Sequence, residues 1–131
     1  MRGRAGAAGR SLPPPDVAAL AALFAGSGTL HLVRPAIFEP IVPHRLPCKR
    51  GLVYASGAVE LGCAAGLAHP STRRLAGLCS VVLLAAVFPA NVQMAVDVAR
   101  ARSRWATMAT VARLPLQLPM ARTAWRAWRA A

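Results

Sequence analysis

The chain has 131 residues, of which 56% are hydrophobic, and it carries a net charge of +12. A length of this order suits one domain. A soluble nucleic-acid-binding protein or a disordered basic tail of this charge would have far fewer apolar residues. Because the basic residues form short clusters between almost uncharged stretches, the composition is typical of helices packed in lipid. The sequence therefore predicts an all-α membrane protein that has the lipid bilayer as a partner and binds no nucleic acid.

Four apolar stretches of helical length follow one another along the chain. The predicted spans are about 16–33, 51–69, 75–97 and 105–121. A stretch of about 20 residues crosses a hydrocarbon core of roughly 30 Å. The fourth stretch is weak, because it contains Arg113 and two prolines, but tryptophans bracket it as they do at membrane interfaces. Gly62 and Gly66 predict a smooth surface for close helix approach. We expect residues 16–122 to form a transmembrane four-helix bundle.

Three polar or proline-rich segments flank these spans. Residues 1–15, with three arginines and a triple proline, predict a flexible basic N-terminal tail. The prolines and Asp16 separate those arginines from the first apolar stretch, which favours a retained helix over a cleaved signal peptide. Residues 34–50 contain four prolines, so they cannot continue a helix. We expect them to form a proline-rich interfacial segment between the first two helices, and residues 123–131 to form a Trp/Arg-rich interfacial C-terminal tail.

The cysteines and histidines give no sign of a metal or disulfide framework. The three cysteines are Cys48, Cys63 and Cys79, an odd number with no pair at two-residue spacing. We expect all three to be structural, with Cys48 alone placed for reaction with a reagent. The three histidines are scattered, and none has a second ligand three or four residues away. The sequence therefore predicts no metal or haem site.

The polar side chains inside the spans gather in the half of the membrane that faces residues 34–50. The predicted polar cluster consists of His31, Tyr54, Ser56, Glu60, Asn91, Arg113 and Gln117. Gln117 is expected in the opposite half and joins the cluster because it follows Arg113 by one turn on the same helix face. An ionisable residue in lipid is costly, so it normally faces the bundle interior and pairs. Glu60 and Arg113 have opposite charges near mid-depth. They predict either a pocket for a small ligand or quinone head group, or a structural ion pair that helps the fourth helix to insert. For His31, with Ser27 one turn earlier, we expect a hydrogen-bonded interior histidine.

A set of short motifs near the ends of the spans carries a family resemblance. The motifs are His31 with Arg34–Pro35, Ile41–Val42–Pro43, Leu46–Pro47, Val53–Tyr54–Ala55–Ser56–Gly57 with Glu60, Arg73–Arg74, Val87–Phe88–Pro89–Ala90–Asn91 and Arg113–Leu114–Pro115–Leu116–Gln117. Together they make the chain, from about residue 17 to 125, resemble the DoxX-like family of small bacterial four-helix membrane proteins. The resemblance implies a bacterial plasma membrane protein with both termini cytoplasmic. The basic residues do not choose an orientation, because eight lie on one side and seven on the other.

Two functions follow from these observations. Named DoxX-like proteins are associated with thiosulfate–quinone oxidoreduction or with a membrane complex for thiol stress. The resemblance thus implies a membrane subunit or scaffold, with a membrane or periplasmic redox protein as a partner. The alternative is an oxidoreductase component that binds a quinone or another small molecule in the polar pocket. The chain has no redox pair of cysteines, no nucleotide fingerprint and no axial haem ligands. We therefore expect a non-catalytic protein. We expect no cofactor, and a quinone is the one candidate if a cofactor is bound. The sequence does not determine the oligomeric state.

Overall fold

The computed structural model describes residues 12–42, 44–100 and 104–130, and it is helical. Its four long helices are α1 (Pro15–Val33), α2 (Lys49–Ala68), α3 (Arg73–Arg100) and α4 (Arg104–Arg129). Two short 3-10 turns, η1 (Pro35–Ile37) and η2 (Glu39–Ile41), follow α1. The all-α prediction is confirmed, and residues 34–48 interrupt the helices as their prolines require. Most of the predicted N-terminal tail, residues 1–11, lies outside the described residues.

Three of the four helices match the predicted spans in length and composition. α1, α2 and α3 are long and apolar enough to cross a membrane. α4 has 26 residues, which is long enough, but it does not reach the same apolarity. Its arginines and Gln117 lower the apolar content along its length. Membrane insertion of α4 therefore stays a prediction.

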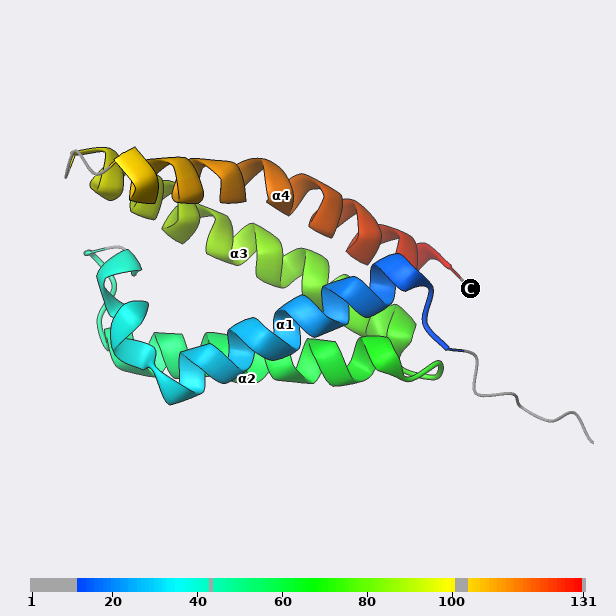
Figure 1. Cartoon of the computed structure of the whole chain (residues 1–131). Coiled ribbons are helices and arrows are strands. Elements are labelled where there is room, and N and C mark those ends of the chain that lie inside the picture. Colours follow the sequence, from blue (N-terminus) through cyan, green and yellow to red (C-terminus); the bar gives the residue numbers. More distant parts are fainter. Residues whose placement is uncertain (1–11, 43, 101–103, 131) are drawn as a thin grey trace, which may run out of the picture.

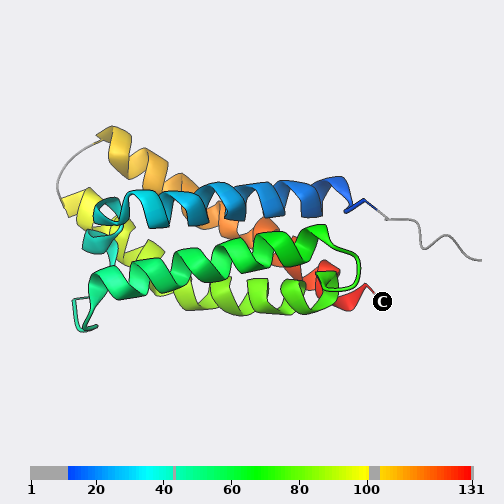
Figure 2. The same cartoon turned by 90° about the horizontal axis from the view of Figure 1, so that it is seen from below.

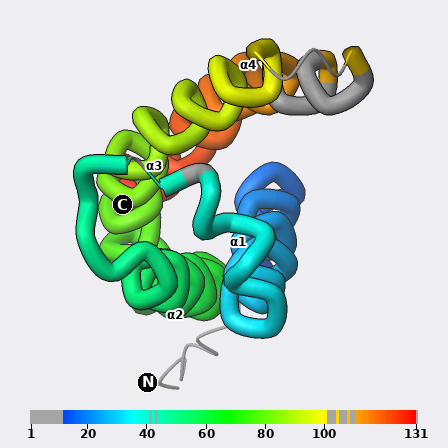
Figure 3. Tube along the Cα trace, turned by 90° about the vertical axis from the view of Figure 1, so that its left-hand side faces the viewer, coloured from blue at the N-terminus to red at the C-terminus, as the bar shows by residue number. Residues whose placement is uncertain are grey.

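The helices pack as two pairs that are joined along one side (Figure 1). α1 lies against α2 and α3 lies against α4, while α2 contacts α3 between the pairs. Figure 2 shows the same arrangement from below. The pairs diverge towards the end that carries η1 and η2, and Figure 3 shows α1 and α4 standing apart there. At the opposite end, Arg126 of α4 forms an ion pair with Asp16 of α1.

Glycines permit the closest helix contacts. A Cβ atom at Gly28 would lie 2.7 Å from the carbonyl oxygen of Gly57, so the backbones of α1 and α2 touch there. A Cβ atom at Gly66 would lie 2.7 Å from Cβ of Ala76, where α2 meets α3. Small residues allow this kind of approach in lipid. The prediction for Gly66 is confirmed, but Gly62 has no described atom within 4 Å of such a Cβ and faces away from the contacts.

The packed core fills only one half of the molecule. Its main cluster of buried apolar residues comes from the first half of α1, the second half of α2, the first half of α3 and the end of α4, whereas the buried Val53 and Ala95 lie outside this cluster. The cluster includes Val17, Leu20, Phe24, Leu67, Leu84, Ala124 and Ala127. The core therefore lies at the end remote from η1 and η2. Large apolar side chains on the outer faces remain exposed, as lipid-facing residues would be.

The C-terminal residues extend the predicted fourth span. The sequence predicts a separate interfacial tail from residue 123, whereas α4 continues to Arg129. Ala124 and Ala127 are buried. A Cβ atom at Gly77 of α3 would lie 2.8 Å from the carbonyl oxygen of Ala124. Close packing of small residues on α3 thus keeps this segment helical, although its arginines and tryptophans resemble an interfacial tail.

A cavity among the four helices as the candidate functional site

A cavity of about 620 Å³ occupies the half of the molecule that the core leaves unfilled. Its lining comes from all four helices and from the connecting segment, residues 34–48. Most of the lining is apolar, and it includes Phe24, Phe38, Val42, Leu83, Val87 and Met120. Ligand-binding cavities in proteins have volumes of about 300 to 1,000 Å³ and combine apolar walls with a few polar groups. The cavity therefore has the size and composition of a small-molecule site.

Six of the seven residues of the predicted polar cluster line this cavity. They are His31, Ser56, Glu60, Asn91, Arg113 and Gln117. Ser56 and Glu60 are one turn apart on α2, so they share the face that is turned to the cavity. Tyr54 is not among the lining residues and is 40% exposed. Two residues along a helix differ by about 200° in direction, which places Tyr54 on another face than Ser56.

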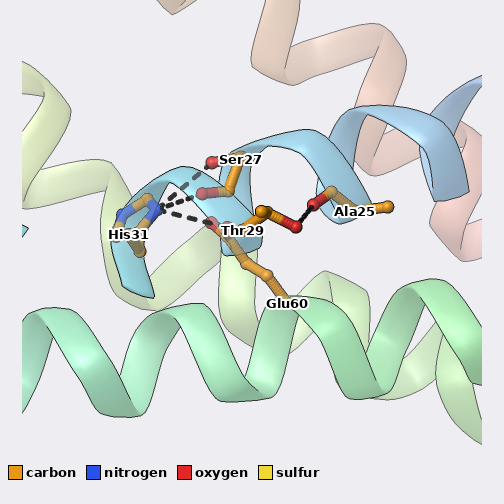
Figure 4. Close-up of polar contacts among 5 residues, drawn as sticks. All are labelled: Ala25, Ser27, Thr29, His31 and Glu60. Carbon is orange, nitrogen blue, oxygen red and sulfur yellow. Dashed lines mark hydrogen bonds and ion pairs between the residues drawn. The ribbon is translucent and has the colours of Figure 1, made fainter. Parts of the chain in front are cut away.

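His31 is held by contacts on several sides (Figure 4). Its Nδ1 atom lies 2.7 Å from the carbonyl oxygen of Ser27 and 3.4 Å from the Ser27 hydroxyl. A carbonyl oxygen only accepts, so Nδ1 carries the proton and donates it to Ser27. Phe38 of the connecting segment stacks on the imidazole, with ring centroids 3.8 Å apart and an angle of 13° between the planes. The prediction of a hydrogen-bonded interior histidine is confirmed.

Glu60 lies next to this histidine with one oxygen lacking a hydrogen bond. The residue is 7% exposed, and Oε2 lies 3.5 Å from Nδ1 of His31. Because the Nδ1 proton points to Ser27, this contact is electrostatic, and no described group makes a hydrogen bond to Oε2. Oε1 of Gln117, on α4, is a second buried oxygen without a described partner. The cavity thus contains two buried acceptors that nothing in the described chain satisfies.

The structure pairs Glu60 differently from the sequence prediction. The ion pair found for Glu60 among the described residues is with His31 and not with Arg113. Arg113 is exposed and lines the same cavity. Glu60 lies on α2 and Arg113 on α4, so they contribute to the lining from different helix pairs. The predicted structural ion pair is therefore not formed directly.

The connecting segment is the part of the site that sequence reasoning missed. Phe38, Val42 and Leu46 line the cavity, and Glu39 forms an ion pair with Arg50 at the start of α2. The prolines were read only as helix breakers in an interfacial segment. The one signal in the sequence is that apolar residues alternate with the prolines of this segment.

None of the three cysteines lines the cavity. All three are free, with Cys63 buried and Cys48 and Cys79 exposed. Within the described ranges, no three side chains of histidine, cysteine, aspartate or glutamate are grouped so that they could hold a metal ion. The chemistry that the site offers is therefore hydrogen bonding and charge from Glu60, His31, Arg113 and Gln117.

Comparisons with known proteins identify a family without a described function. Searches of curated proteins and of solved structures found no match. A family model described as a domain of unknown function (DUF8561) matches residues 20–128. This range begins within α1 and ends within α4, so it includes all the elements that line the cavity. The chain therefore belongs to the DUF8561 family.

Proposed function

We propose that this chain is a multi-pass membrane protein that binds a small amphiphilic molecule in its cavity without transforming it. The observation that supports this proposal is the cavity of about 620 Å³, to which all four helices contribute walls. Three of these helices are apolar enough to cross a membrane. A cavity at that depth is surrounded by lipid, so its natural occupants are molecules that dissolve in lipid and carry a polar group.

In this proposal the four helices form a transmembrane bundle, with α4 inserted beside α3. The connecting segment lies at the membrane interface, where Arg34, Arg45, Lys49 and Arg50 reach the head groups. Its apolar side chains turn inward to the cavity. The resemblance to DoxX-like proteins adds a bacterial plasma membrane, with both termini cytoplasmic and the connecting segment on the outer side.

Exposed side chains that line the cavity on both helices support a route into it between α1 and α4. These helices stand apart at the end that carries the connecting segment (Figure 3), whereas Asp16 and Arg126 join them at the other end. Leu23 of α1 and Leu116 of α4 both line the cavity and are half exposed. A lipid-soluble molecule thus enters sideways from the bilayer.

Native mass spectrometry of the full chain in mild detergent tests this function. We expect a co-purifying small molecule that is lost or weakened in Ala90→Phe, because Ala90 lines the cavity and the larger ring would occupy space that the molecule needs. Ala85→Phe is the matched control, since Ala85 lies on the same helix, is exposed and does not line the cavity. An adduct that survives Ala90→Phe as fully as Ala85→Phe would place the molecule elsewhere.

A second function, a membrane subunit or scaffold, is supported by the character of α4. α4 is not apolar enough to qualify as a span, yet it exposes Val111 and Leu118 on its outer face. A partner helix that covered this face would keep α4 in the membrane. For a DoxX-like protein the partner would be a redox protein. Cross-linking from a cysteine placed at Leu118 would capture such a partner, whereas lipid alone would give no protein adduct.

A further inference from the structure

We propose that the cavity selects neutral amphiphiles whose head group carries hydroxyls, such as a monoacylglycerol. This proposal rests on the proposed function and specifies its ligand. It starts from the two buried oxygens without partners, Oε2 of Glu60 and Oε1 of Gln117. Buried polar atoms in proteins nearly always have a hydrogen-bond partner, and each exception calls for an unseen group that supplies one.

The missing partner must be a donor. Oε2 of Glu60 and Oε1 of Gln117 are both acceptors. Nδ1–H of His31, whose nitrogen lies 3.5 Å from Oε2 of Glu60, is already directed at the carbonyl of Ser27 at 2.7 Å. A head group that offers only carbonyl or ether oxygens has no proton to give. A hydroxyl donates one, and it can still accept from a neighbouring donor such as Arg113.

The cavity has one charged side chain of each sign. Arg113 repels an ammonium group and attracts a carboxylate, and Glu60, which is more than nine-tenths buried, does the reverse. Attraction to one of these side chains is therefore opposed by repulsion from the other, so the cavity gives no advantage to a head group with a net charge. A neutral donor meets neither repulsion. Among neutral donors a hydroxyl is small enough to approach Glu60 between α1 and α2.

The apolar part of the ligand has its own place. Phe24, Leu83 and Leu84 close the cavity towards the packed core, while Leu23 and Leu116 border the gap between α1 and α4. A head group at Glu60 therefore leaves its chain free to run along these side chains and out into the bilayer. This placement fits a lipid with one hydrocarbon chain and a compact polyol head.

The test measures binding of monooleoylglycerol to the full chain in lipid nanodiscs. The comparison ligand is the same ester with both hydroxyls methylated, which keeps the chain and removes the donors. We expect wild type to bind monooleoylglycerol about tenfold to hundredfold more tightly, the range for a hydrogen bond to a charged group. Glu60→Leu should remove most of this preference but retain binding of the methylated ester. Gln117→Leu should reduce the preference as an independent variant. Gln93→Leu is the matched control and should leave the preference unchanged, because Gln93 bonds to Asp97 on its own helix and does not line the cavity.

The possible outcomes separate this inference from the function beneath it. If wild type binds both esters equally and Ala90→Phe blocks both, the cavity binds amphiphiles and the hydroxyl selectivity is wrong. If neither ester binds wild type, the selectivity and the proposed function are both overturned. If the preference survives Glu60→Leu and Gln117→Leu, the hydroxyl is recognised somewhere other than at these two oxygens, and the inference fails. The comparison of the two esters on wild type needs no variant to fold.

Discussion

The contact between α1 and α2 makes a prediction that two neighbouring glycines can test. Gly57 and Gly62 both lie inside α2, but only Gly57 faces α1. A Cβ atom at Gly57 would lie 2.7 Å from Cβ of His31 and 3.0 Å from the carbonyl oxygen of Gly28. No described atom lies within 4 Å of such a Cβ at Gly62. Replacing each glycine by alanine adds the same methyl group in two different surroundings.

The expected difference follows from two opposing terms. Alanine is favoured over glycine inside a helix by about 1 kcal/mol, and this gain applies to both positions. Carbon atoms pack at about 3.5 to 4.0 Å, so at Gly57 the helices would have to separate by roughly 0.8 Å. Overpacking of this kind costs about 1 to 3 kcal/mol. Gly57→Ala should therefore be about 1 to 3 kcal/mol less stable than Gly62→Ala, which should match or exceed wild type.

Thermal unfolding in one detergent, followed by circular dichroism, measures this difference. The two alanine variants are each other's control, because the change in helix propensity cancels between them. Ligand binding gives a second readout, since a shift of His31 moves it relative to Glu60 in the cavity. Equal melting temperatures for the two variants would refute the close approach of α1 and α2, and with it the position of the His31 cluster.

Three further predictions test other parts of the fold. The protein should stay in the membrane fraction after an alkaline wash, and release into the supernatant would contradict the spanning helices. Cys48 should react with a membrane-impermeant maleimide in intact cells, while the buried Cys63 should react only after denaturation; labelling of Cys48 only after lysis would reverse the proposed orientation. Because Glu60 and Arg113 form no direct ion pair, the effects of Glu60→Leu and Arg113→Leu on stability should add within about 0.5 kcal/mol. A coupling energy above about 1 kcal/mol in the double variant would instead be evidence for the ion pair that the sequence predicts.

The helices could be predicted because the length of an apolar stretch can be read directly from neighbouring residues in the sequence. The run from Arg73 to Arg100 is almost uncharged at its centre, and the structure makes it one continuous helix through Pro89. The prolines of residues 34–48 could likewise be read as a break. The end of α4 could not be predicted, because the helix beyond residue 121 packs against α3 where Gly77 approaches Ala124. Such a contact between distant residues leaves no trace in local composition.

For the candidate site, the sequence could predict how deep each residue lies along its helix but not which residues of other helices it contacts. Counting residues from the span ends placed His31, Glu60 and Asn91 in one half of the molecule, and these residues line one cavity. Depth does not determine which helices are neighbours, so opposite charge alone suggested a pair between Glu60 and Arg113. The structure places α2 beside α1. Glu60 consequently meets His31, whose imidazole projects from the helix that touches α2 through Gly28 and Gly57.

The polarity of α4 and the presence of the cavity have the same physical cause. Arg113 and Gln117 are one turn apart, so they lie on one face, and both line the cavity. Val111 and Leu118, on other faces, are exposed to the surroundings. An arginine facing lipid at mid-depth costs about 2.5 to 3.5 kcal/mol on insertion scales, whereas an arginine that faces a cavity avoids contact with lipid and part of that cost. The cavity thus permits α4 to remain beside α3, and a ligand that fills the cavity would bind to α4 and α1 together and hold the two helix pairs at a fixed separation.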